Sequence, residues 1–118
     1  MTRAIVLRLA MLALTSPAFA HAFLERSSPP VGSEVAAPPR RITLTFTEGI
    51  EPSFSTIEVR DAQGVLVTTG KPRLDPDDNR KLVVELPALR SGRYAVIWHV
   101  TSVDTHKTEG CFQFTVAP

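Results

Sequence analysis

Short segments with alternating apolar and polar residues make up much of the chain after residue 40. In "RITLTF" (41–46), the apolar residues Ile42, Leu44 and Phe46 alternate with threonines. This period of two places every second side chain on the same face of a β-strand. The same period occurs in three further segments: "STIEVR" (55–60) with Ile57 and Val59, "KLVVEL" (81–86) with Leu82, Val84 and Leu86, and "CFQFTV" (111–116) with Phe112, Phe114 and Val116. We therefore predict four strands, each with one face in a core.

The segment "GRYAVIWHV" (92–100) is apolar on both faces. Ala95 and Ile97 form one face, and the other is formed by Tyr94, Val96, Trp98 and Val100. A strand that is apolar on both sides is typical of the centre of a sheet. We predict a central strand that carries Trp98, the one tryptophan, into the core among Ile42, Leu44, Phe46, Val96, Phe112 and Phe114.

Proline and glycine interrupt the chain at short intervals and leave no room for a long amphipathic helix. "RDAQGVL" predicts a hairpin between Val59 and Leu66, with Gly64 supplying the positive φ. "LDPDDNR" (74–80) is interpreted as a solvated loop. About seven short strands separated by turns indicate one all-β domain, an antiparallel Greek-key sandwich or barrel.

The first twenty residues have the pattern of a secretory signal peptide. Arg3 and Arg8 precede an apolar stretch at 9–14, and Ala18-Phe19-Ala20 has the small-x-small pattern of a cleavage site. A membrane-spanning helix needs about 20 apolar residues, and this stretch is shorter. We expect residues 1–20 to be removed on export and residues 21–118 to form the mature domain.

Charge and cysteine content indicate which partners and which covalent links to expect. Loss of Arg3 and Arg8 changes the formal net charge from +1 to −1, which gives no reason to expect binding to nucleic acid or an anionic membrane. The single cysteine, Cys111, cannot form an internal disulfide. We expect a soluble monomer that is stabilised by its apolar core alone.

Cleavage after Ala20 would leave His21 at the N-terminus, where its α-amine and imidazole can chelate a metal ion. The amine has a pKa of about 7.7–8.0, so it loses its proton more readily than lysine does. Further along, "SVDTHKTEG" contains Asp104 and His106, whose side chains would point to the same side of an extended backbone. By itself this pair is more simply explained by an Asp–His hydrogen bond. With His21 it supplies three nitrogens and one carboxylate, a set that suits Cu(II).

Three stretches resemble the CopC family of periplasmic copper-resistance proteins: "HAFLERSSPPVGSEVAAPPRRITLTFTEGI", "GRYAVIWHVTSVDTHKTEG" and "FQFTV". The resemblance covers nearly the whole mature chain. It implies an immunoglobulin-like, cupredoxin-related β-sandwich that binds one Cu(II) per chain in the periplasm. It implies His21, Asp104 and His106 as ligands, with Glu48 beside them as a supporting group or occasional ligand.

The resemblance further implies a non-enzymatic carrier or buffer in copper resistance or homeostasis. An inner-membrane copper importer or another copper protein would then be its partner. Some members have a methionine-rich Cu(I) site at the other end of the barrel. Here Met1 and Met11 both lie in the signal peptide, so we expect no such site. Lys107 stands where a proline is common, and Cys111 stands where a small polar residue is usual.

Two other functions remain open at this stage. An N-terminal histidine with a second imidazole also resembles the copper brace of lytic polysaccharide monooxygenases, although those chains are longer and have a flat binding face. Alternatively, the chain is a metal-free immunoglobulin-like interaction module in which Asp104 and His106 bond each other. We interpret His99 as an ordinary half-exposed strand residue, and Cys111 as a residue that points away from the apolar face.

Overall fold

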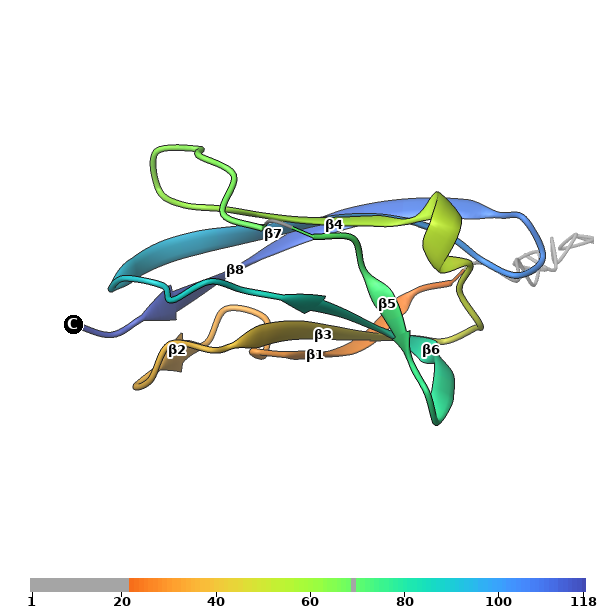
Figure 1. Cartoon of the computed structure of the whole chain (residues 1–118), viewed down its shortest axis with the longest axis horizontal. Helices are drawn as coiled ribbons and strands as arrows, with labels where there is room; N and C mark the ends of the chain where they lie inside the picture. Colours follow the sequence, from red (N-terminus) through yellow and green to blue (C-terminus); the bar gives the residue numbers. More distant parts are fainter. Residues whose placement is uncertain (1–21, 69) are drawn as a thin grey trace, which may run out of the picture.

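The computed structural model describes residues 22–68 and 70–118, which form two four-stranded sheets packed face to face (Figure 1). One sheet has the order β1 (Leu24–Ser28), β3 (Arg41–Phe46), β6 (Asp78–Glu85) and β5 (Arg73–Asp75). The other has the order β2 (Glu34–Val35), β8 (Lys107–Val116), β7 (Gly92–Thr101) and β4 (Thr56–Arg60). A 3-10 turn, η1 (Pro52–Phe54), precedes β4. The predicted all-β sandwich is confirmed.

The core lies between the sheets, on the faces that the alternation predicted. Every apolar residue assigned above to a core face, from Ile42 to Val116, is buried. Strand β7 is a central strand, as predicted, because it pairs with β8 on one side and with β4 on the other. Trp98 is only 7% exposed, and its ring meets that of Phe46 edge to face, with centroids 5.2 Å apart.

Gly110 makes room for the tryptophan. It is the residue of β8 directly opposite Trp98 of β7, so a side chain there would point to the same face of the sheet. A Cβ atom at position 110 would collide with the indole ring. The absence of a side chain therefore allows the ring to lie over the backbone of β8.

The interpretation of 74–80 as a loop is wrong. Strands β5 and β6 are joined by a two-residue turn at Pro76 and Asp77, with Asp75 opposite Asp78. The Asp75 carboxylate accepts a hydrogen bond from the Asp77 amide at 2.9 Å. These polar residues form a hairpin at the edge of a sheet, where a strand needs no apolar face to be stable, so its composition resembles that of a loop.

The hairpin predicted between Val59 and Leu66 is confirmed in part: the turn around Gly64 is present, but Leu66 belongs to no strand. Arg60 and Leu66 form an isolated antiparallel bridge, and Gly64 has a φ of 81°. Strands β1 and β2 are additions to the predicted set, and neither has an alternating apolar face. In the described part of the chain, no helix is long and apolar enough to span a membrane.

The loop between β7 and β8, the turn η1 and the start of β1 gather at one end of the sandwich, and the C-terminus lies at the other (Figure 1). The fold therefore places the "SVDTH" segment beside the first described residues.

Candidate metal centre

Asp104 and His106 lie together on the loop of residues 102–106 that joins β7 to β8. Nδ1 of His106 is 3.3 Å from Oδ2 of Asp104. The side chains are about half-exposed, 48% for His106 and 37% for Asp104. The structure thus brings these two predicted site residues together in a position that solvent can reach.

The physical reason for their proximity differs from the one that spacing suggested. The loop is not extended: the Ser102 amide donates to the His106 carbonyl and the Thr105 amide to the Ser102 carbonyl, both at 2.9 Å. Thr105 has a φ of 73°, the left-handed region, which β-branched residues rarely adopt. A tight turn, rather than strand alternation, places the carboxylate next to the imidazole.

This geometry predicts that glycine is more stabilising than alanine at position 105, the reverse of the usual order. Thr105→Gly should be more stable than Thr105→Ala by about 1 kcal/mol, because an L-residue costs about 1–2 kcal/mol in the left-handed region and glycine does not. Both variants lose the hydrogen bond from Thr105 Oγ1 to the Asp104 carbonyl. The difference between their free energies of unfolding therefore depends on the backbone conformation alone. Chemical denaturation of the metal-free protein measures it.

Thr56, an exposed residue of β4 without a positive φ, is the matched control. There the alanine variant should be the more stable of the two, as is usual outside the left-handed region. If alanine were also the more stable residue at position 105, Thr105 would not have the conformation described.

A buried serine connects both members of the pair. Ser102 is completely buried, and its hydroxyl donates to Oδ1 of Asp104. Its oxygen also accepts the backbone N–H of His106 at 3.2 Å. Our sequence reasoning missed Ser102. The available signal was a serine two residues before an aspartate, a spacing at which a hydroxyl bonds locally within a turn.

The surroundings of Asp104 favour its charged form. The hydroxyl of Ser102 is the main cause that lowers the pKa of this carboxyl below its ordinary value, and His106 acts in the same direction. Partial burial of the carboxyl opposes this shift. Asp104 is therefore a carboxylate at any pH near neutrality, which is the form that can bind a metal ion.

The segment after β3 supports the loop. The Val103 amide donates to the Gly49 carbonyl at 2.9 Å, and Ile50 forms an isolated bridge with Ser102. Glu48, which is half-buried, belongs to this segment. Across residues 22–68 and 70–118, no three His, Cys, Asp or Glu side chains form a group that could hold a metal ion, so the structure does not group Glu48 with Asp104 and His106.

His21 lies outside the described residues, but the chain immediately after it is anchored beside the loop. Ala22 is completely buried, and its carbonyl accepts a hydrogen bond from Oγ1 of Thr108 at 2.8 Å. Thr108 follows His106 by two residues at the start of β8. The Phe23 amide donates to Oγ1 of Thr47 at 3.0 Å, which ties this segment to the end of β3.

His99 and Cys111 are separate from this loop. Nε2 of His99 lies 2.9 Å from a carboxylate oxygen of Glu109 on the outer face of the β7–β8 pair, where both side chains are exposed. Cys111 is an exposed free thiol, as expected from its alternation with the phenylalanines. The two residues are thus surface positions, in agreement with the sequence analysis.

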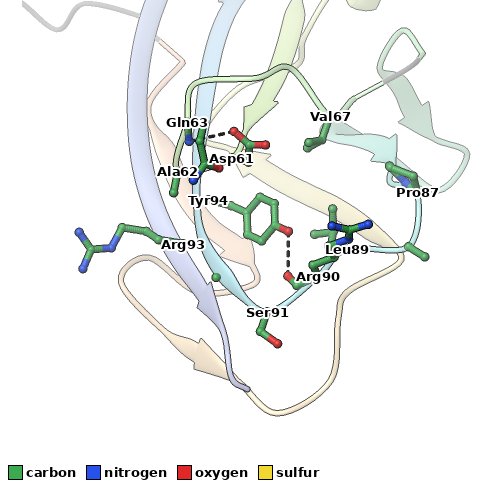
Figure 2. A pocket seen from close by; sticks show the side chains of 12 residues that line it. Asp61, Ala62, Gln63, Val67, Pro87, Leu89, Arg90, Ser91, Arg93 and Tyr94 are labelled. Atoms are coloured by element: carbon green, nitrogen blue, oxygen red, sulfur yellow. Dashed lines mark hydrogen bonds between the residues drawn. The ribbon is translucent and has the colours of Figure 1, made fainter.

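A surface groove lies at the opposite end of the sandwich, where β7 begins (Figure 2). Its wall includes Tyr94, whose hydroxyl donates to the Arg90 carbonyl at 2.7 Å. Across from it, the Asp61 carboxylate accepts the backbone N–H groups of Gln63 and Val65. The side chains that line this groove include no thioether, thiol or imidazole.

These observations define an immunoglobulin-like β-sandwich with a carboxylate–imidazole pair on one end loop. The family model of the CopC domain matches residues 24–117. The chain belongs to the CopC family, as the sequence resemblance predicted.

The relatives match this chain over most of their length. Protein YobA of Escherichia coli K12 is 38% identical over 104 residues, which cover 87% of this chain and 84% of YobA. Copper resistance protein C of Xanthomonas campestris pv. juglandis is 35% identical over 118 residues, or 95% of this chain and 91% of that protein. The crystal structure of CopC from Methylosinus trichosporium OB3b is 39% identical and superimposes with a TM-score of 0.79 over 83% of this chain and 95% of that one.

Proposed function

We propose that this chain is a periplasmic Cu(II)-binding protein that carries or buffers copper and catalyses no reaction. The ligands in this proposal are the amine and imidazole of His21, the carboxylate of Asp104 and the imidazole of His106. The pairing of Asp104 with His106 on the β7–β8 loop is the observation that carries it. The name of a relative, copper resistance protein C, supports copper as the cargo.

The described part of the site fits a metal ion chemically. Two neighbouring donors, each about 2.0–2.2 Å from one metal ion, lie about 3 Å apart when they subtend a right angle. The 3.3 Å between Oδ2 of Asp104 and Nδ1 of His106 is close to that value. The pair therefore needs little movement to act together.

The anchoring of Ala22 supports the participation of His21. Consecutive Cα atoms are about 3.8 Å apart, so the covalent chain limits how far His21 can be from Ala22. Ala22 in turn is bonded to Thr108, two residues from His106. A mature N-terminus at His21 would therefore begin close to the Asp104–His106 pair.

Solvent access and donor type favour a carrier of Cu(II). The half-exposed ligands at the end of the sandwich could exchange an ion with a partner, such as an inner-membrane copper importer or another copper protein. Nitrogen and carboxylate donors suit Cu(II), whereas Cu(I) prefers the thioethers that residues 21–118 lack. A signal peptide at 1–20 would deliver the chain to the periplasm.

Electron paramagnetic resonance (EPR) of the mature protein, residues 21–118, loaded with Cu(II) tests this function. We expect one Cu(II) per chain, coordinated by three nitrogens. His106→Ala should remove one nitrogen from the spectrum and weaken binding, because its imidazole is a ligand in this proposal. His99→Ala, which removes the imidazole that faces Glu109, is the matched control and should leave the spectrum unchanged. A mature protein that binds no Cu(II) would instead favour a metal-free interaction module.

A further inference from the structure

We propose that Ser102 is a positioning residue of the copper site, which orients the Asp104 carboxylate so that Oδ2 is the oxygen available to the metal ion. This inference rests on the proposed function, because it assigns a role within the same site. Ser102 is not itself a ligand in this proposal.

All hydrogen bonds of the Ser102 hydroxyl remain within its own loop. A buried hydroxyl requires partners, and Ser102 is completely buried. The hydroxyl donates to Oδ1 of Asp104 and accepts the His106 amide at 3.2 Å, and the His106 carbonyl lies 3.3 Å away. One buried oxygen atom thus contacts both residues that are proposed to bind copper.

The two carboxylate oxygens of Asp104 consequently have different surroundings. Oδ1 receives the Ser102 hydroxyl, whereas Oδ2 faces Nδ1 of His106 at 3.3 Å. The hydrogen bond from Ser102 competes with a metal ion for the lone pairs of Oδ1, whereas Oδ2 lies on the side of the second proposed ligand, His106. The geometry therefore favours coordination through Oδ2 alone rather than through both oxygens.

Ser102 can act as a fixed reference because backbone hydrogen bonds hold it directly after the end of β7. Its amide bonds the His106 carbonyl at 2.9 Å, and it forms a bridge with Ile50. The preceding residue, Thr101, ends β7 and pairs there with Lys107, the first residue of β8. The half-exposed carboxylate is thus connected to the core through a residue that cannot move independently of it.

Loss of this hydroxyl should weaken copper binding without removing a ligand. The Asp104 carboxylate would be free to rotate, and ordering it on binding would then cost conformational entropy. Groups that orient metal ligands typically contribute about 10–100-fold to metal affinity. We expect a loss of this size in Ser102→Ala.

Ser55 provides a matched control at the same end of the molecule. It is also buried, and its hydroxyl donates to the Glu51 carbonyl at 2.7 Å and accepts the Thr101 amide at 3.1 Å. Neither partner is a proposed ligand. Ser55→Ala therefore removes a buried, bonded hydroxyl but leaves the contacts with Asp104 and His106 intact.

The experiment compares mature wild-type protein, Ser102→Ala and Ser55→Ala. Competitive Cu(II) titration should show about 10–100-fold weaker binding for Ser102→Ala and an unchanged affinity for Ser55→Ala. The EPR spectrum of Ser102→Ala should also change, because the carboxylate would be free to bind in another way. Thermal unfolding of the metal-free proteins should show similar losses for both variants.

A measurement without metal tests the same inference separately. Hydrogen exchange of the His106 amide should be faster in Ser102→Ala than in wild type or Ser55→Ala, because this amide donates to the missing hydroxyl. Two results would overturn the role of Ser102 but leave the proposed function standing. The first is a Cu(II) affinity and an EPR spectrum of Ser102→Ala equal to those of the wild type. The second is an equal loss of affinity in Ser102→Ala and Ser55→Ala. A wild-type protein that binds no Cu(II) would overturn both.

Discussion

One glycine added before His21 is expected to weaken Cu(II) binding by the mature protein by several orders of magnitude. The addition converts the α-amine of His21 into an amide nitrogen, which loses its proton far less readily than an amine. The imidazole of His21, Asp104 and His106 all remain, so the loss would belong to the amine. Two donors joined on one residue bind with an advantage on the order of 10²–10⁴-fold, which sets the scale of the effect.

Competitive Cu(II) titration of residues 21–118, with and without the added glycine, measures this loss. The metal-free proteins should unfold at the same temperature, because the extra residue adds nothing to the core between the sheets. His99→Ala serves as a control for loss of an imidazole outside the site and should bind normally. Equal affinities with and without the glycine would show that the amine is not a ligand.

Trp98→Ala is expected to lower the free energy of unfolding by about 3–5 kcal/mol, the usual cost of truncating a buried aromatic residue. The indole ring is almost fully buried, meets Phe46 edge to face and covers Gly110. A cavity at this position would lie between the two sheets, where the backbone cannot easily collapse around it. The chain has no disulfide to compensate for the loss.

Chemical denaturation of the metal-free protein tests this prediction. Phe54→Ala is the control, because Phe54 in η1 is 72% exposed and its truncation should change the free energy of unfolding by no more than about 0.5 kcal/mol. An effect of Trp98→Ala as small as that of Phe54→Ala would contradict the position of Trp98 in the core.

The sequence alone predicted the strands that bury a face. In β3, β4, β6 and β8 the apolar residues of the core face alternate with other residues, because successive side chains of a strand point to opposite faces of its sheet. Strand β7 was recognised because it is apolar on both faces, as is typical of a central strand. Strands that bury little escaped this reasoning: β1 and β2 have no alternating face, and the β5–β6 hairpin begins with the polar residues of an apparent loop. An alternating pattern in the sequence indicates that a strand buries one face. These elements bury little and are stabilised chiefly by the hydrogen bonds of their backbone, which leave no such pattern.

For the candidate site, the sequence identified the chemistry and the tertiary structure decided the arrangement. The residue types alone indicated Asp104 and His106, because carboxylates and imidazoles bind metal ions in any fold. Only the structure shows that a left-handed Thr105 brings them together and that the buried Ser102 bonds both. Likewise, the contact of Ala22 with Thr108 joins residues 86 positions apart. Such contacts depend on how the two sheets pack and on where their loops meet, which no local pattern along the chain encodes.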